Sequence, residues 1–437
     1  MSDMTPSAGG EETISIAPFL RNTASMIAGA LVRLGLQGAY FVVIARSLGA
    51  DQFGAFSGVL ALIAVLSPFA SLGMGNLIIK SVSHDKTTFR DSWGNALFTT
   101  VALSAAFLVL VLLSARFVLP REISWLLLVF VALSDMLLVN IVNLAGQAFQ
   151  AFEQLSKTSR VQVVLIGTRV AAAVILVGIN RHPTAMLWSG GYFLGTAAAA
   201  LCCFIWVCRT LGSPTLALGS LRRKVLEGLY FSVSLSSQSI YNNIDKTMLA
   251  RLSTLDGTGI YTTAYRLIDL AFQPVSALLA STYSRFFHHG ADGLAASTRF
   301  ARRLLPFSTG YGLFAALGLA LTAPIVPYAL GDSYARAVEA VWWLSPIILL
   351  RSVHYFLADS LTGSGFQGFR TLVQMMVAGL NVLLNLWLIP AYGWRGAAWA
   401  SLASDGMLMV GLAFSIFLLS RGSRPAPVAC IEPDATL

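Results

Sequence analysis

The chain has 437 residues, of which 56% are hydrophobic and only 11% are charged. Soluble domains carry roughly 25% charged residues, so this composition excludes an ordinary soluble enzyme and favours a protein that lies mostly in lipid. The net charge of +9 does not indicate nucleic-acid binding, because the basic residues are scattered singly along short connections.

Residues 1–17 are polar and acidic and lack the basic region that precedes the apolar core of a signal peptide. We expect an N-terminal tail over residues 1–20. Windows of about 20 mainly apolar residues, the length needed to cross a bilayer, then recur along the chain. They are, in order, 22–45, 52–76, 92–115, 123–152, 159–179, 185–208, 225–250, 257–284, 304–323, 338–359, 369–390 and 396–420. The sequence thus predicts an all-α integral membrane protein with twelve transmembrane helices.

The distribution of Lys and Arg predicts the topology, because these residues favour short cytoplasmic connections. With both termini inside, seventeen of them fall on the cytoplasmic side, seven on the opposite side and five within the spans. We therefore expect cytoplasmic termini. The longest basic connection, residues 210–224, then lies between spans six and seven and is predicted to be a cytoplasmic linker. It separates an N-terminal lobe, 21–209, from a C-terminal lobe, 225–420, and a tail follows at 421–437.

A short internal repeat supports this division. The segment ARSLGADQFGAF at 45–56 matches ARLSTLDGTGIY at 250–261 without a gap, at an offset of 205 residues. Each segment lies between the first and second spans of its half. Because each half has an even number of spans, the two six-helix lobes should share an orientation and be related by a pseudo-two-fold axis along the membrane normal.

Charged residues within the spans are the strongest functional signal. A charge at mid-bilayer costs roughly 2.5 to 3.5 kcal/mol, so such residues usually face the bundle interior or an aqueous cavity. The bases are Arg33, Arg169, Lys246, Arg266 and Arg351, and the acids are Asp135, Asp245, Asp269, Asp359 and Asp405. Arg33, Arg169 and Arg351 have no acid three or four residues away, which favours an anionic ligand or a distant partner. Arg266 and Asp269, in contrast, have the i, i+3 spacing of an ion pair within one helix.

Polar residues also follow helical periodicity. Thr262, Arg266, Asp269 and Gln273 fall on one face of the eighth span. Similar stripes are Ser234, Gln238, Asn242 and Asp245 in the seventh span, Arg33, Gln37 and Tyr40 in the first, and Asn140, Asn143 and Gln147 in the fourth. Hydrogen bonds and ion pairs between helices are one explanation. Stripes on several helices nevertheless favour a cavity between them.

No cofactor or metal site is predicted. Gly363, Gly365 and Gly368 form a GxGxxG motif, but it follows a transmembrane helix rather than a strand, so it does not indicate dinucleotide binding. The chain has neither a GxxxxGK[ST] phosphate loop nor an HExxH zinc motif. The clustered Cys202, Cys203 and Cys208 lack the spacing of metal ligands.

Two segments carry a family resemblance. YNNIDKTMLARLSTLDGTGIYTTAYRLIDLAFQP at 241–274 and ARSLGADQFGAFSGVLALIAVLSPFASLGM at 45–74 resemble the Wzx-type polysaccharide flippases of the MOP exporter superfamily. With twelve spans in two sixes, the resemblance extends over residues 20–420. It implies a MOP/MATE-like fold, with two six-helix lobes around a central cationic cavity that opens alternately to the two sides, and lateral access for lipid near the first and eighth helices.

The resemblance also implies a substrate and a location. Such proteins move an undecaprenyl-diphosphate-linked oligosaccharide from the cytoplasmic to the periplasmic leaflet of the bacterial inner membrane, for surface polysaccharide or exopolysaccharide synthesis. Their partners are membrane lipid and the polysaccharide polymerase and glycosyltransferases of the same pathway. The related lipid II flippases usually have two additional helices, so twelve spans favour the oligosaccharide branch.

The charged residues fit this chemistry. Arg offers a planar and permanently charged fork of donors that suits phosphate. We expect an anion-binding set of Arg33, Arg169, Lys246, Arg266 and Arg351, with Arg33 and Arg266 flanking the portal. Tyr40, Tyr241 and Trp188 are candidates for stacking on sugar rings, although aromatic residues are also common at membrane interfaces. Because the chain has no nucleotide-hydrolysing module, Asp245 and Asp269 are hypothesised to couple transport to protons or sodium.

Three alternatives stay open. A multidrug antiporter of the same superfamily should have a net acidic cavity, but five bases against five acids within the spans do not decide this. An integral-membrane polysaccharide polymerase or ligase usually needs a sizeable outer loop, whereas every predicted outer connection here is short. A structural scaffold gives no reason for Arg in four different helices. We therefore predict a membrane transporter rather than an enzyme.

Overall fold

The computed structural model describes residues 16–217 and 221–422. Within these ranges the chain forms helices and short connections, with no β-strand. Most of the predicted tails, residues 1–15 and 423–437, and residues 218–220 of the predicted linker lie outside the described residues.

The helices follow the predicted spans closely. The first half contains α1 (Ile16–Ser71), α2 (Met74–His84), η1 (Lys86–Thr88), α3 (Phe89–Val118), α4 (Trp125–Ala132), the π-helix η2 (Leu133–Leu138), α5 (Val139–Ala151), α6 (Leu155–Ile179) and α7 (Ala185–Thr210). The second half contains α8 (Leu221–Leu252), α9 (Leu255–Ala291), α10 (Leu294–Thr322), η4 (Ala323–Ile325), α11 (Val326–Leu330), η5 (Asp332–Tyr334), α12 (Ala337–Leu344), α13 (Pro346–Gly363), α14 (Gln367–Tyr392) and α15 (Trp394–Gly422).

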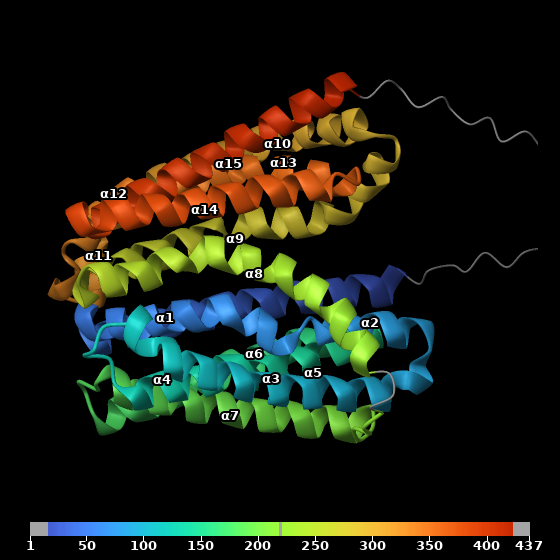
Figure 1. The fold of residues 1–437 in the computed structure, drawn as a ribbon, viewed down its shortest axis with the longest axis horizontal. Helices are drawn as coiled ribbons and strands as arrows, with labels where there is room; N and C mark the ends of the chain where they lie inside the picture. The colour runs from blue at the N-terminus through green and yellow to red at the C-terminus, as the bar shows by residue number, and fades with distance from the viewer. Residues whose placement is uncertain (1–15, 218–220, 423–437) are drawn as a thin grey trace, which may run out of the picture.

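The helices form two neighbouring bundles (Figure 1). Helices α1–α7 lie on one side and α9–α15 on the other, while α8 runs between them toward α2. The most extensive contacts between the halves join α1 to α8 and α9. The start of α1 and the end of α15 lie at the same end of the bundles (Figure 1). This arrangement resembles the predicted pair of lobes, although the boundaries at 21–209 and 225–420 stay a prediction.

Several predicted spans are broken by local geometry. The single helix α1 contains a kink at Gly49, whose φ of 70° is left-handed, so it consists of two helices that correspond to the first two spans. The second of these ends at Ser71, because Leu72 and Gly73 both have positive φ and separate it from α2. The tenth span, 338–359, is divided into α12 and α13, which are bent by 42°.

The count of twelve spans is not confirmed. Among the described residues, eight helices are long and apolar enough to cross a membrane, or nine if the bent pair α12 and α13 forms one span. The first of the eight, Val32–His84, includes the kink at Gly49. Helices α8 and α9 are not among the eight, and both carry the predicted polar stripes. The chain is therefore a multi-pass helical membrane protein.

The end of the first half is held on α3. Thr215 donates a hydrogen bond from its hydroxyl to the Asp91 carboxylate, and its backbone N–H donates to the Arg90 carbonyl. Asn95 both donates to the carbonyl of Ala217 and accepts from its N–H. This described part of the predicted linker, 210–224, is therefore anchored to the N-terminal bundle.

The internal repeat meets itself at the interface between the bundles. A Cβ on Gly54 would lie 1.8 Å from the carbonyl oxygen of Leu255, and a Cβ on Gly259 would lie 1.9 Å from that of Ala50. Ala50 and Leu255, like Gly54 and Gly259, are separated by the repeat offset of 205 residues. The contact between α1 and α9 is thus reciprocal, as a pseudo-two-fold axis requires, and depends on the absence of side chains at both glycines.

We expect Gly54→Ala and Gly259→Ala to destabilise the protein by pushing α1 and α9 apart. Overpacking a close contact typically costs about 1–3 kcal/mol, and a clash with backbone should lie at the upper end. Thermal unfolding of the detergent-solubilised protein, followed by size-exclusion chromatography, measures the effect. Gly38→Ala is a matched control in α1, because its Cβ would meet nothing within 4 Å. Unchanged melting of both repeat variants would disprove the close contact.

Candidate substrate-binding cavity

A cavity of about 770 Å³ lies between the two bundles. Its walls come from α1, η2, α6 and α7 in the first half and from α8, α9 and α13 in the second. All four members of the predicted α9 stripe, Thr262, Arg266, Asp269 and Gln273, line it. The polar face of α9 therefore exists because it borders this cavity rather than lipid.

The other stripes contribute as well. Gln37 and Tyr40 of α1 and Asn242 of α8 line the same cavity. Asn140, Asn143 and Gln147 of α5 line a second cavity of about 600 Å³, which shares Ala64, Asp135, Asn242 and Asn243 with the first. The side chains of Ser234 and Gln238 lie outside the described part of the chain. Of the described stripe residues, Arg33 and Asp245 line neither cavity, and all the others line one or both.

Four of the five cations of the predicted anion-binding set meet in the first cavity. Arg169 comes from α6, Lys246 from α8, Arg266 from α9 and Arg351 from α13. Arg33 lies one turn before Gln37 on α1 and is not among the lining residues. Helices that are far apart in sequence thus bring their basic residues to one space.

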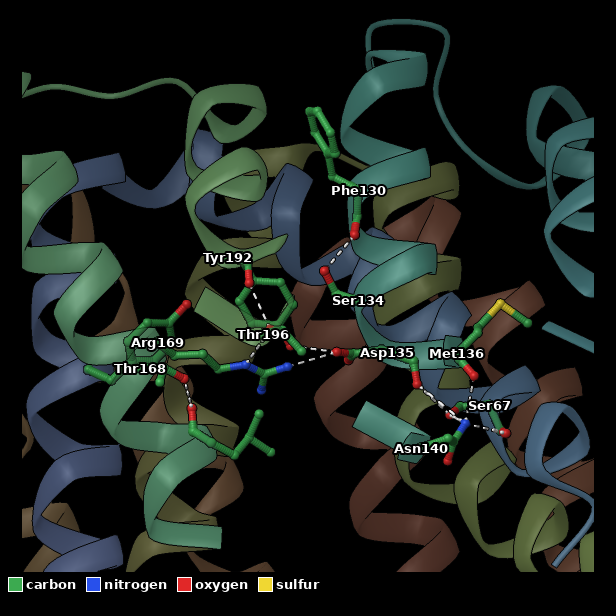
Figure 2. Close-up of polar contacts among 12 residues, drawn as sticks. Ser67, Phe130, Ser134, Asp135, Met136, Asn140, Thr168, Arg169, Tyr192 and Thr196 are labelled. Carbon is green, nitrogen blue, oxygen red and sulfur yellow. Dashed lines mark hydrogen bonds and ion pairs between the residues drawn. The ribbon is translucent and has the colours of Figure 1, made fainter. Parts of the chain in front are cut away.

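Arg169 is held by an ion pair within the N-terminal bundle (Figure 2). Its Nη2 lies 3.0 Å from Oδ1 of Asp135, and its Nε donates to the hydroxyl of Thr196 at 3.0 Å. The hydroxyl of Tyr192 donates to the same Asp135 oxygen at 2.7 Å, and the guanidinium carbon lies 4.0 Å from the centre of the Tyr192 ring. The sequence left an anionic ligand or a distant partner open for Arg169, and Asp135 is that distant partner.

Asp135 lies in a π-helical turn that the sequence did not predict. The predicted continuous span 123–152 is divided into α4, the π-helix η2 and α5. The side chains of Ser67 and Asn140 donate to backbone carbonyls of this turn, with Ser67 Oγ 3.0 Å from Asp135 O and Asn140 Nδ2 2.8 Å from Met136 O (Figure 2). Single π-turns inside α-helices are frequent at functional sites. Here the turn carries the acid that borders both cavities.

Arg351 forms a second network in the C-terminal bundle. Its Nη1 lies 3.2 Å from Oδ1 of Asp269, and its Nε lies 3.8 Å from Oδ1 of Asp405. Asp405 also contacts Nε2 of His354 at 2.9 Å. The Arg351 side chain is only 8% exposed, whereas the Asp269 side chain is 50% exposed. The expected i, i+3 pair of Arg266 with Asp269 is therefore not formed, because Asp269 pairs with Arg351 across helices.

Lys246 belongs to a third network. Its Nζ lies 3.6 Å from Oδ1 of Asp245, donates to the Asn242 carbonyl, and sits 4.5 Å from the centre of the Tyr265 ring. Asp245 is buried and also accepts from the hydroxyl of Tyr261. Of the two acids hypothesised to couple ions, Asp269 therefore faces the cavity, and Asp245 lies behind it.

Arg266 differs from the other cations of the cavity. Its side chain is exposed. Among the described residues it has neither an ion pair nor a side-chain hydrogen bond, whereas Arg169, Lys246 and Arg351 each lie within 4 Å of a carboxylate. Arg266 is thus the lining cation whose charge is not already compensated in the described part of the protein.

Of the predicted aromatic residues, one lines the first cavity and two do not. Tyr40 lines the cavity, and its hydroxyl accepts a hydrogen bond from the indole N–H of Trp188 at 3.1 Å. Trp188 is buried and supports Tyr40 from behind. Tyr241 packs against the apolar cluster of α13, α14 and α15 and lines neither cavity.

Three lining tyrosines were missed by the sequence analysis, namely Tyr192, Tyr265 and Tyr355. Tyr265 directly precedes Arg266, and a step of one residue rotates a side chain by about 100°, so the stripe pattern did not include it. No signal in the sequence distinguished Tyr192 or Tyr355 from other aromatic residues in spans.

Within the described residues, no three or more His, Cys, Asp or Glu side chains form a group that could hold a metal ion. The two acids that line the first cavity, Asp135 and Asp269, are instead paired with Arg169 and Arg351.

Comparison with known proteins decides the family. A family model described as "Polysaccharide biosynthesis protein" matches residues 19–286, which is more than half of the chain. The chain belongs to the polysaccharide biosynthesis protein family. No curated protein matches it significantly.

Solved structures show that this family member has the fold of MOP-type transporters. Lipid II flippase MurJ, in an inward closed conformation, has a TM-score of 0.72 at 9% identity, covering 91% of this chain and 87% of that chain. An inward-facing multidrug resistance MATE family transporter of the MOP superfamily has a TM-score of 0.70 at 16% identity, covering 90% and 100%. The MATE multidrug transporter DinF-BH has a TM-score of 0.65 at 14% identity, covering 96% and 98%.

These findings confirm the family resemblance that the sequence predicted. The solved structures with this fold are a lipid II flippase and multidrug transporters, which agrees with the prediction of a membrane transporter rather than an enzyme. The identities are low, so the solved structures establish the fold of this polysaccharide biosynthesis protein and not its cargo.

We expect Asp135→Leu to destabilise this family member, because it leaves the guanidinium of Arg169 without its carboxylate. Removing one partner of a buried ion pair costs about 3–5 kcal/mol, whereas replacing both partners by apolar residues is often neutral. The double variant Asp135→Leu/Arg169→Leu should therefore recover most of the loss in thermal unfolding of the purified protein. A double variant that melts no higher than Asp135→Leu would show that the pair does not carry this stability.

Proposed function

We propose that this protein flips an undecaprenyl-diphosphate-linked oligosaccharide across the bacterial inner membrane, by alternating access of the cavity between its two bundles. The family description supports a role in polysaccharide biosynthesis, and a lipid II flippase shares the fold. The substrate supplies building blocks for a surface polysaccharide or exopolysaccharide. Glycosyltransferases that build it and a polymerase that consumes it are the expected partners.

The observation that carries this proposal is the charge of the cavity wall. Four cations line the first cavity, and three of them, Arg169, Lys246 and Arg351, are each paired with a carboxylate. Among the described residues the positive charge of Arg266 is left uncompensated, and a diphosphate diester, which carries one negative charge on each phosphate, would supply the missing negative charge. Anions bind well in a partly desolvated site only if fixed positive charges replace the lost water.

Arg266 is the proposed first contact for the diphosphate. Its guanidinium is exposed to the cavity and lacks a carboxylate among the described residues, and an Arg fork binds phosphate oxygens in pairs. Arg351 lies on the same wall, and its partner Asp269 is half exposed. A phosphate that approaches Arg266 can therefore share Arg351 with Asp269, while the carboxylate of Asp405 keeps that guanidinium in place.

Arg33 and Tyr241 have more limited roles in this proposal. Arg33, on the same face of α1 as Gln37 and Tyr40, does not line the cavity, so we propose that it binds the headgroup at the lipid portal instead. Tyr241 packs in an apolar cluster and stabilises the C-terminal bundle. Tyr40 is kept as a sugar-stacking candidate.

The finer topology is part of the proposal. The stretch Val32–His84 contains two helices on either side of Gly49, and α12 and α13 make one bent crossing. Of the eight apolar stretches, Val32–His84 therefore counts as two crossings and the other seven count as one each, which makes nine. The bent pair α12 and α13 adds one crossing. Helices α8 and α9, whose polar stripes lower their hydropathy, add two, so the proposed total is twelve crossings in two six-helix lobes, 21–209 and 225–420. The termini then lie on one side of the membrane, which the Lys and Arg distribution makes the cytoplasmic side.

A multidrug antiporter is the second candidate, because two multidrug transporters share the fold. A cationic drug would meet an excess of positive charge in the first cavity, which disfavours it. A polysaccharide polymerase or ligase is disfavoured because the described connections between helices are short.

We expect Arg266→Ala to abolish flipping, or to reduce its rate at least tenfold, with normal amounts of protein in the membrane. The reason is the loss of the uncompensated charge, and Arg266→Lys should retain part of the activity. Proteoliposomes with a fluorescent lipid-linked oligosaccharide, quenched from one side, measure the rate. Arg302→Ala, at an exposed position of α10 outside the cavity, is the matched control.

Deletion in cells distinguishes the candidate functions. Loss of surface polysaccharide with accumulation of cytoplasm-facing lipid-linked repeat units supports the flippase. Drug sensitivity with normal polysaccharide would falsify it, as would full flipping activity of Arg266→Ala.

Asp269→Asn tests ion coupling through the cavity. If the half-exposed Asp269 carboxylate binds a proton or sodium, its neutral isostere should uncouple flipping, so that the rate no longer responds to an imposed proton or sodium gradient. The buried Asp245→Asn is compared in the same vesicles. A gradient response that persists unchanged in both variants would eliminate both acids as coupling sites.

A further inference from the structure

The second cavity has a wall of different chemistry from the first. Amide side chains from the N-terminal bundle and from α8 line it, including Asn76 of α2, Asn143, Gln147 and Gln150 of α5, Gln162 of α6 and Asn242 of α8. Asp135, at the junction with the first cavity, is its one ionisable lining residue among the described residues. We call this cavity of about 600 Å³ the amide chamber.

Helical periodicity builds the amide chamber. Asn140, Asn143, Gln147 and Gln150 are spaced i, i+3, i+7 and i+10, so they share one face of α5. The Gln162 amide of α6 donates to the side-chain oxygen of Asn143 at 3.3 Å. Gln147 is seated against Gly75, where a Cβ would lie 1.4 Å from its amide oxygen. The lack of a side chain at Gly75 therefore makes room for Gln147.

The amide side chains of the chamber form two groups, those that hydrogen-bond within the protein and those that do not. Asn140 is used in the protein, because its amide donates to Ser67 and to the carbonyl of Met136. In contrast, the side chains of Gln147, Gln150 and Asn242 have no hydrogen-bond partner among the described residues. Each such amide offers two donors and two acceptor lone pairs. Gln147 and Asn242 are half-buried and Gln150 is exposed, so these amides are open to whatever occupies the chamber.

The available chemistry fits neutral sugars. A sugar hydroxyl both donates and accepts, as an amide does, and needs no charge compensation. A phosphate in the amide chamber would find no cation among the described lining residues, and it would meet the carboxylate of Asp135. The volume of about 600 Å³ lies within the range of about 300–1,000 Å³ for small-molecule sites.

We infer that the amide chamber is the subsite for the sugars next to the diphosphate, and that it selects neutral hydroxyl- or acetamido-bearing sugars over uronic acids. The inference rests on the proposed function, which places the diphosphate at Arg266. Because Asp135, Asn242 and Asn243 border both cavities, a headgroup with its diphosphate in the first cavity reaches the amide chamber directly. Asp135 then lies at the boundary between the subsite for the diphosphate and the subsite for the sugars.

Binding of three lipids to the full-length protein in nanodiscs tests the inference. The probes are undecaprenyl diphosphate, the same lipid with one N-acetylglucosamine, and the same lipid with one glucuronic acid. Wild-type protein should bind the N-acetylglucosamine lipid more tightly than the bare lipid, and the glucuronic acid lipid should show no such gain. Gln147→Ala should reduce the gain about threefold to tenfold, the effect of one or two hydrogen bonds, with little change for the bare lipid.

Controls separate this inference from the proposed function. Gln374→Ala removes an amide of α14 that lines neither cavity and should preserve the gain. Gly75→Ala should reduce the gain by displacing Gln147, so it repeats the test without deleting the amide. Arg266→Ala should weaken all three lipids equally. The sugar subsite alone is overturned if Gln147→Ala and Gly75→Ala both keep the tighter binding of the N-acetylglucosamine lipid over the bare lipid. It is also overturned if the glucuronic acid lipid binds as tightly as the N-acetylglucosamine lipid. Binding of the bare lipid that Arg266→Ala leaves unchanged contradicts the proposed function.

Discussion

A cation at the depth of the lipid tails needs either a carboxylate or water and ligand to compensate its charge. In this protein Arg169, Lys246 and Arg351 take the first solution, each with an acid. Arg266 has no carboxylate partner among the described residues and faces the cavity between the bundles, so we propose that water and the ligand compensate its charge. The same requirement explains why polar stripes on α1, α8 and α9 converge there, since a cavity that holds water or an anionic headgroup is the one place where they are stable.

The ion pairs also give the cavity wall its shape. Asp135 joins Arg169 and Tyr192 within the N-terminal bundle, and Asp405 with Asp269 holds Arg351 in the C-terminal bundle. Each of these two networks lies within a single bundle, so a change in the relative positions of the bundles would break neither network. The alternating access proposed above needs this property.

The sequence predicted those features that depend on periodicity and on the cost of buried charge. The α9 stripe from Thr262 to Gln273 lines the cavity as its spacing required, and most helix ends lie within a few residues of the predicted spans. The partners of the charged residues could not be predicted, because they lie far apart in the sequence. Asp135 and Arg169, for example, are 34 residues apart. Asp269 pairs with Arg351 rather than with Arg266, so Arg266 has no ion pair among the described residues. The π-turn at Asp135 had no signal in the sequence, since α- and π-turns use the same residues. The repeat at 45–56 and 250–261 was visible, but its reciprocal contact appeared only in three dimensions.

Our central proposal is that an anionic lipid headgroup occupies the space between the bundles, with its charge on Arg266. A cryo-electron microscopy structure of the protein in nanodiscs, loaded with an undecaprenyl-diphosphate-linked sugar, tests it most directly. We predict density for the diphosphate within hydrogen-bond distance of the Arg266 guanidinium, next to Arg351. A headgroup bound on the lipid-facing surface, with the cavity between the bundles free of it, would contradict this proposal.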